Sequence, residues 1–389
     1  MTQKLSAWNY IKNNKRRVLV LIVSLSLCFM AVYITRFMLG TAEGSFRKVL
    51  IDYYSKMQYV ELAGSSFGID VEHTLPEEAA RIYNEENEKL AEKLRSEKGV
   101  QRVYYVPYIY SEIAAVVGTI SVEVPLMERT EDVETVMAHM GAKLIEGRLP
   151  EKPGEVIIDE ASVKNNHYRI GGYFNEDNFG KDFIVSGIVS CDSYFGAGLE
   201  RAGYDQAYIC ILSDGSLYDI AEILDRNGLK VRDGYDMVWD RKNGEKWLKE
   251  EVTDVINSSI TLIFTGVLVL LSLALFIVYT MYLRDRHGEW CLYCSIGYSR
   301  RTIYFSIIRE LLFSFITAIL IGGLLIIFIG RILEMLIITS QGLFCGFWYP
   351  EVLAEILCAY MFLFGLLQIP VRFALYRIRT VDALDDDMY

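Results

Sequence analysis

Long apolar blocks constrain the fold of this chain more than any other feature of its sequence. A helix needs about 20 mostly apolar residues to cross the hydrocarbon core of a bilayer. Four stretches are long and apolar enough, and we predict a membrane span in each: 18–39, 259–283, 310–333 and 352–371. An apolar fraction of 52% agrees with this interpretation.

A secretory signal peptide is the alternative for the first block, because five Lys and Arg residues precede it. The apolar cores of signal peptides span about 7–15 residues, which is shorter than this block. The following segment, MLGTAEGS, offers only a weak cleavage site. We therefore predict an uncleaved anchor that follows a cytoplasmic tail at 1–17.

The placement of charge predicts the topology, since Lys and Arg near membrane spans favour the cytoplasmic side. These residues occur in the tail 1–17, the loop 284–309 and the tail 372–389, whereas the loop 334–351 has none. Between Thr41 and Asn257 there are 24 Lys and Arg against 40 Asp and Glu. We expect both termini in the cytoplasm and the acidic segment 40–258 outside. The aromatic residues of loop 334–351 suit a membrane interface: Phe344, Phe347, Trp348 and Tyr349.

The extracytoplasmic segment has the pattern of an α+β domain. Residues 45–64 are predicted to continue the first helix, and the charged stretch from Pro76 to Gly99 predicts a second one. Strands are predicted in the β-branched and aromatic stretch 102–124 and in EVIID, FIVSGIVS and QAYICIL, followed by a helix that ends at Gly228. The predicted fold class is thus an α-helical membrane protein with four transmembrane helices and a large α+β domain between the first two.

No catalytic or metal-binding constellation stands out in the extracytoplasmic segment. It lacks the zinc motif HExxH, and its histidines are scattered. Cys191 and Cys210 are its only cysteines. They form either a disulfide or a pair of small buried thiols in neighbouring strands.

The stretch RDRHGEWCLYCSIGYSRR, at 284–301, contains a Cys-x-x-Cys pair at Cys291 and Cys294, with His287 four residues earlier. On a helix these three side chains share one face. A structural zinc site needs a fourth ligand, and a redox role needs a thioredoxin-like context, neither of which the sequence supplies. We therefore assign no metal or cofactor to the chain and interpret the stretch as a mechanical element.

Several motifs resemble the FtsX-like permeases of MacB-type ABC transporters. AEKLRSEKGVQRVYYV and FIVSGIVS are similar to that family's helix–turn–strand and its "F.V.GI" strand. KLIEGRLPEKPGEVIID resembles its "GR.P....EV" segment through Gly147, Arg148, Pro150 and Glu155. The final stretch, PVRFALYRIRTVDAL, resembles the family's closing segment, although Val381 stands where proline is common.

The loop 284–309 carries the most specific resemblance, to the pattern "RR.EIG.LRALGAS.R.I" and a later glutamate. Cys291, Cys294 and Ser295 depart from this pattern. The resemblance implies a short amphipathic helix, about 286–296, that docks on a cytoplasmic ATPase, with Trp290 and Tyr293 as apolar anchors. The residues expected to couple the ATPase to the membrane helices are Arg286, Glu289, Trp290, Tyr293, Gly297, Ser299, Arg300, Arg301 and Glu310.

The resemblance implies a non-catalytic permease subunit in a bacterial cell membrane. Its ATP and Mg would be bound by a separate ATPase, because the chain has no G-x-x-x-x-G-K-[ST] phosphate loop. The other expected partners are a second permease copy and membrane lipid, but no nucleic acid. Export or efflux of a peptide-like or antimicrobial substrate is the expected output, and the acidic domain favours a cationic peptide.

Two other functions remain open at the level of sequence. A mechanotransmitting or sensory FtsX-like protein would regulate a cell-wall hydrolase or a signalling kinase. A receptor without any ATPase would leave the pattern in loop 284–309 unexplained.

Overall fold

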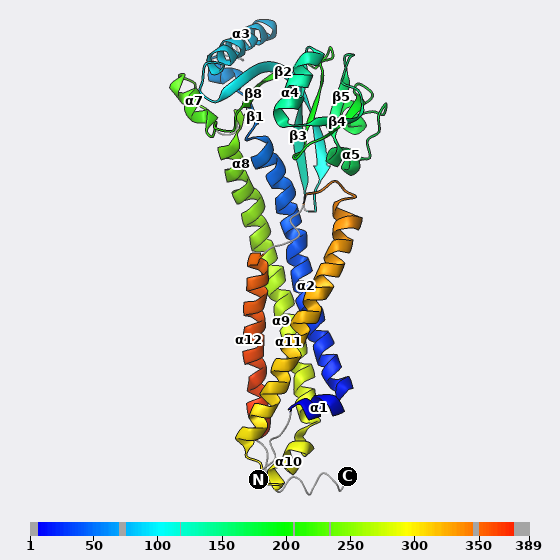
Figure 1. The fold of residues 1–389 in the computed structure, drawn as a ribbon. Coiled ribbons are helices and arrows are strands. Elements are labelled where there is room, and N and C mark those ends of the chain that lie inside the picture. Colours follow the sequence, from blue (N-terminus) through cyan, green and yellow to red (C-terminus); the bar gives the residue numbers. More distant parts are fainter. Residues whose placement is uncertain are drawn as a thin grey trace. The chain divides into compact units, whose positions relative to one another are not determined.

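The computed structural model describes residues 7–69, 75–116, 118–204, 207–232, 235–344 and 350–376 (Figure 1). Its backbone contacts define two units. The helical unit comprises Met1–Met38, Ser258–Glu334 and Phe347–Tyr389. The sheet domain comprises Leu39–Asn257 and Met335–Gly346.

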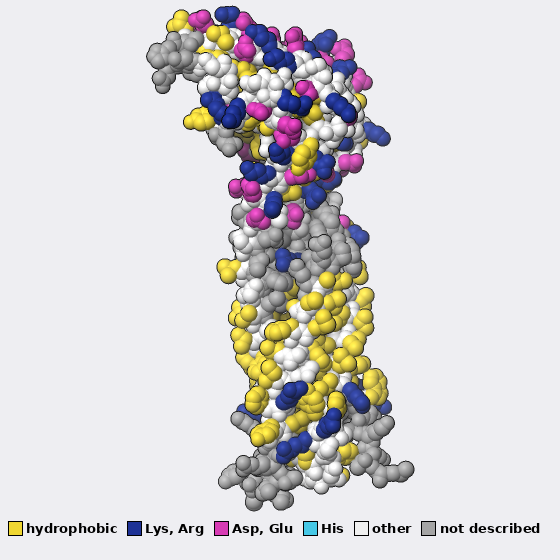
Figure 2. Space-filling model, turned by 90° about the vertical axis from the view of Figure 1, so that its left-hand side faces the viewer, with side chains coloured by type: hydrophobic (Ala, Val, Ile, Leu, Met, Phe, Trp, Pro, Cys, Tyr) yellow, Lys and Arg dark blue, Asp and Glu magenta, His cyan; other side chains and the backbone are white. Residues whose placement is uncertain are grey.

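Long apolar helices dominate the helical unit, and hydrophobic side chains cover much of its visible face in Figure 2, with Lys and Arg gathered toward one end. Among the described residues, three stretches are long and apolar enough to cross a membrane: Val18–Tyr53, Arg300–Ile338 and Ile356–Tyr376. They agree with the first, third and fourth predicted spans. The helices are α1 (Ala7–Asn13), α2 (Lys15–Arg47), α9 (Asp254–Arg284), α10 (His287–Ser295), α11 (Arg300–Leu333) and α12 (Pro350–Tyr376).

The second predicted span falls within α9. The described apolar stretch of this helix, Val269–Arg284, is shorter than a full span. Several side chains nearer the start of α9 lie outside the described residues. A second span at 259–283 therefore stays a prediction.

Close contacts join α2, α11 and α12 within the helical unit. The Ser26 hydroxyl of α2 donates a hydrogen bond to the carbonyl of Ala318 in α11, at 3.1 Å. Tyr360 of α12 donates to the carbonyl of Leu25, and its ring meets Phe29 edge to face at 5.3 Å. Small and polar side chains let these helices approach closely, as in other membrane bundles.

The sheet domain is built on one mixed sheet, as the α+β prediction requires. Within the described residues it has nine strands in the order β4-β6-β5-β7-β3-β2-β8-β1-β9. Only the β3–β7 and β5–β6 pairs are parallel. The strands are β1 (Met57–Glu61), β2 (Val100–Ala114), β3 (Thr119–Met127), β4 (Lys143–Gly147), β5 (Glu155–Asp159), β6 (Ile184–Ser190), β7 (Gly196–Leu199), β8 (Ala207–Ser213) and β9 (Met237–Trp239).

Strand β2 joins the two halves of this sheet, because its first part pairs with β8 and its second part with β3. Alternate side chains of β8 enter different cores: Ile209 and Ile211 pack with α3 and α7, and Cys210 packs with α4 and the end of α2. The sheet domain also contains η1 (Lys48–Tyr53), η2 (Gly64–Phe67), α3 (Pro76–Leu94), α4 (Thr130–Met140), α5 (Glu160–Asn166), α6 (Glu176–Phe179), α7 (Ile220–Arg226), α8 (Arg241–Trp247), η3 (Leu248–Thr253) and η4 (Glu334–Ile338).

Two predictions for this domain need correction. The helix predicted through residue 64 ends at Tyr53, and Met57–Glu61 forms the strand β1 between β8 and β9. Cys191 and Cys210 are free thiols, and only Cys210 lies in a strand. Phe344, one of the aromatic residues predicted at a membrane interface, packs against Tyr194 within the same compact unit, and the other three, Phe347, Trp348 and Tyr349, lie outside the described residues.

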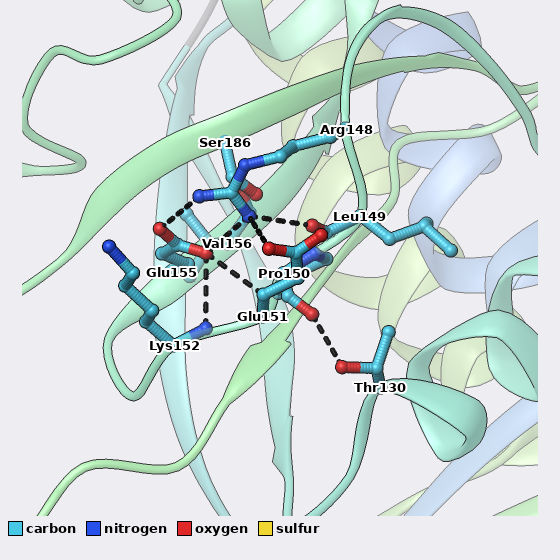
Figure 3. A network of polar contacts seen from close by, with 9 residues as sticks. All are labelled: Thr130, Arg148, Leu149, Pro150, Glu151, Lys152, Glu155, Val156 and Ser186. Atoms are coloured by element: carbon cyan, nitrogen blue, oxygen red, sulfur yellow. Dashed lines mark hydrogen bonds and ion pairs between the residues drawn. The ribbon is translucent and has the colours of Figure 1, made fainter.

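The segment GRLPEKPGE closes the turn between β4 and β5 through an ion pair (Figure 3). Arg148 donates to both carboxylate oxygens of Glu155, at 2.7 and 2.6 Å. The backbone N–H groups of Glu151 and Lys152 also donate to this carboxylate. These bonds, led by that from Arg148, lower the pKa of Glu155 to about 2. The motif therefore has a structural role in this chain.

Candidate coupling site

The loop between α9 and α11 folds as the short helix α10, His287–Ser295, which confirms the helix predicted at about 286–296. Two residues set its boundary with α11. Gly297 has a φ of +101°, a left-handed conformation that ends a helix and favours glycine. Ser299 then caps α11, and its hydroxyl accepts a hydrogen bond from the N–H of Thr302 at 3.2 Å.

Arg286 lies at the centre of a buried polar cluster that joins α9, α10 and α11. Its Nη1 is 2.6 Å from Oε2 of Glu310 in α11 and 3.3 Å from the hydroxyl of Tyr282 in α9. Its Nε is 3.4 Å from Oε2 of Glu289 in α10. The guanidinium also lies 5.5 Å from the ring centres of both Tyr282 and Trp290, within the range of cation–π attraction.

The centre of the cluster is closed to solvent, since Arg286, Trp290 and Glu310 are only 2%, 1% and 6% exposed, whereas the Glu289 side chain at its edge is 39% exposed. A buried charge is costly unless a partner of opposite charge and further hydrogen bonds compensate it. Arg286 provides this compensation to Glu310 across 24 residues of sequence. The cluster thus fixes the orientation of α10 against the start of α11.

The burial of Trp290 contradicts its predicted role as an exposed anchor for an ATPase. Tyr293 is half-buried and meets the ring of Tyr298 edge to face at 6.1 Å. The exposed apolar side chains of this region are instead Leu292 and Ile296, at 57% and 65%. Their spacing of four residues places them on one face of the helix. This spacing is visible in the sequence, but the larger side chains of Trp290 and Tyr293 were predicted as the anchors instead.

The structure therefore divides the predicted site residues into two groups. Arg286, Glu289, Trp290 and Glu310 come together in the cluster around Arg286. Tyr282 also belongs to this cluster, although it was not among the predicted site residues. The others lie along the turn and the first residues of α11: Tyr293, Gly297, Ser299, Arg300 and Arg301. Arg300 and Arg301 are exposed, and Arg301 lies over the ring of Phe305.

The thiol of Cys291 lies 3.6 Å from Nδ1 of His287. Within the described parts of the chain, no group of three His, Cys, Asp or Glu side chains is placed to hold a metal ion. The side chain of Cys291 is only 1% exposed.

These features define a helical protein with apolar membrane-type helices, a mixed-sheet domain and a compact loop helix. The model of the family described as "FtsX-like permease C-terminal" matches residues 261–383, which include the whole buried cluster. Over this region the chain is similar to the FtsX-like permeases, the family that the motif in loop 284–309 resembles.

Two solved structures are similar to the sheet domain only in a general way. The periplasmic region of MacB from Actinobacillus actinomycetemcomitans is 16% identical, with a TM-score of 0.27 over 51% of this chain and 94% of that chain. The extracellular domain of the ABC-type transporter YknZ from Gram-positive bacteria is 11% identical, with a TM-score of 0.25 over 39% of this chain and 88% of that chain. No curated protein sequence matches this chain.

Proposed function

We propose that this chain is the non-catalytic permease subunit of an ABC transporter whose separate cytoplasmic ATPase binds ATP and Mg. The observation that carries the proposal is the buried Arg286–Glu310 pair, which lies within the region matched by the permease family. Because it links the loop helix to α11, a push on α10 would be passed directly to a membrane helix. ATP hydrolysis would in this way move the sheet domain.

The expected output is export or efflux of a peptide-like or antimicrobial substrate. The segment Thr41–Asn257, with 24 Lys and Arg against 40 Asp and Glu, would attract a cationic peptide over a long range. A second permease copy, identical or homologous, would complete the membrane bundle. Exposed apolar side chains of α9, α11 and α12 are available for that copy or for lipid.

Replacing Ile296 with glutamate is expected to weaken capture of the ATPase by about tenfold or more. Loss of one buried apolar anchor of this size removes about 1.5–3 kcal/mol of binding. The measurement is co-purification of the ATPase with the full-length chain from its native membrane. Ile145→Glu is the matched control, because Ile145 is also exposed, at 54%, but lies in the sheet domain. Equal capture by both variants would count against docking at α10.

Gly297→Val and Glu289→Lys are expected to uncouple ATP hydrolysis from transport while leaving membrane insertion unchanged. Valine strains the left-handed conformation of Gly297 by about 1–2 kcal/mol. Lysine at position 289 puts a second positive charge in place of the carboxylate that now lies 3.4 Å from Nε of Arg286. ATPase activity and substrate export are measured on the same reconstituted complex. Unchanged export in both variants would exclude the proposed coupling.

A further inference from the structure

The segment after η4 folds back onto the sheet domain. We call residues 339–344 the strap. Their contacts place them in the same compact unit as Leu39–Asn257, although the preceding residues of α11 belong to the helical unit. The sequence predicts only a short loop here, so this association is a feature of the tertiary structure.

The strap meets α5 and the turn before β7 mainly through its backbone. The carbonyl of Gln341 accepts a hydrogen bond from Nδ2 of Asn165, at 2.8 Å. The carbonyl of Gly342 accepts one from the hydroxyl of Tyr194, at 3.2 Å. A β-carbon added at Gly342 would overlap the carbonyl oxygen of Ala161, and its φ of +62° also favours glycine.

The end of α2 holds the other side of the strap. The Ser45 hydroxyl lies 3.3 Å from both the N–H and the carbonyl oxygen of Phe344. The Phe344 ring meets Tyr194 edge to face at 4.9 Å, and Lys48 lies 5.4 Å from its centre. Ser45 and Tyr194 are both fully buried, so these contacts are protected from water.

A rigid support lies beneath the strap. Asp159, at the end of β5, caps α5 and accepts hydrogen bonds from the N–H groups of Ser162 and Phe195, each at 2.9 Å. Its carboxyl is buried, and this burial raises its pKa to about 6. The wall formed by α5 is therefore tied to β5 and β7, and a force on the strap would be passed to the sheet.

We propose that the strap is a mechanical link that fastens the sheet domain to α11. The chain continuity of α2 and α9 provides two links between the units, and the docked strap provides a third. A body held at two points can rotate about the line between them, whereas a third attachment removes that freedom. This proposal rests on the proposed function. Through the strap, part of the motion that the ATPase drives would reach the sheet domain from α11.

Cys191 provides a reporter of docking that needs no ATPase. It lines a cavity of about 180 Å³ together with Lys164, Thr339, Leu343 and Phe344. The test uses the full-length chain with serine at its five cysteines other than Cys191 and the fully buried Cys210. The rate of maleimide labelling then measures how often the strap leaves its site.

Gly342→Val is expected to speed the labelling of Cys191 by about tenfold or more, because its clash with a backbone carbonyl cannot be relieved by a rotamer change. Tyr194→Phe removes a single hydrogen bond and should speed it by a few fold. Gly171→Val is the matched control: its φ is +80° but no atom lies within 4 Å of the added β-carbon. Labelling of Gly342→Val at the wild-type rate, or no faster than Gly171→Val, overturns the docked strap.

The mechanical role is tested with the ATPase present. Gly342→Val should keep ATPase binding and hydrolysis but lose export, whereas Gly171→Val should keep all three. Full export by Gly342→Val, despite fast labelling of Cys191, overturns the transmission of motion through the strap. If no ATPase associates with the wild-type chain, the proposed function fails, and the labelling rates still decide whether the strap is docked.

Discussion

Replacing Arg286 with alanine is expected to lower the free energy of unfolding of the helical unit by about 3–5 kcal/mol, the usual cost of leaving a buried charge without its partner. Glu310, only 6% exposed, would lose the Nη1 contact at 2.6 Å. Tyr282 and Trp290 would also lose the cation–π contact that packs α10 against its neighbours. Thermal unfolding of the full-length chain in detergent measures the change.

Two further variants separate the ion pair from general damage to the bundle. The double variant Arg286→Met, Glu310→Leu should recover most of the lost stability, because a buried ion pair can be replaced by apolar side chains at little cost. Arg331→Ala removes the ion pair between Arg331 and Glu334, in which the Arg331 side chain is 64% exposed. This change should lower the free energy of unfolding by less than about 1 kcal/mol. A cost for Arg286→Ala as small as that for Arg331→Ala would refute the structural role of the cluster.

Replacing Glu123 with glutamine is expected to stabilise the sheet domain by up to about 3 kcal/mol at pH 8. Glu123 lies in β3, and its carboxyl group accepts a hydrogen bond from the Tyr54 hydroxyl at 2.7 Å. The residue is only partly exposed, and its carboxyl group is enclosed by protein atoms. Burial raises the pKa of this group from 4.5 to about 7, against the smaller opposing effect of the Tyr54 hydrogen bond.

The sign of the pH dependence follows from this raised pKa. The folded protein holds the Glu123 proton more tightly than the unfolded chain, so the group favours folding fully below pH 4.5. That contribution is lost as pH rises through about 7, and the whole shift corresponds to about 3 kcal/mol. Glutamine keeps the shape without the proton equilibrium. The free energy of unfolding of the variant should therefore change less between pH 5 and about 8.

Glu155→Gln is the control of opposite sign. Arg148 lowers the pKa of Glu155 to about 2, so its ionised form favours folding above pH 4.5 and this contribution is lost as pH falls through 2. Glutamine at this position should therefore destabilise the domain at pH 8. If the free energy of unfolding of Glu123→Gln varies with pH in the same way as that of the wild type from pH 5 to about 8, the carboxyl group of Glu123 does not cause the pH dependence.

Part of the candidate coupling site could be predicted from the sequence. The pattern around Glu289, Gly297 and Arg300 located a short helix, and that helix is present at His287–Ser295. Which of its side chains face inward could not be predicted, because this depends on where α11 lies. Trp290 turned out to be buried, and Ile296 exposed, once Glu310 was placed opposite Arg286.

The sequence by itself determined the elements whose signals are local. Apolar blocks of spanning length, the charged helix from Pro76 and the period-two strands EVIID and QAYICIL need no distant partner to be recognised. The tertiary structure alone decided that Met57–Glu61 is a strand, because its partners β8 and β9 lie about 150 or more residues away. It also decided the place of the strap, because backbone contacts such as that of Gly342 with Tyr194 leave no pattern in the sequence.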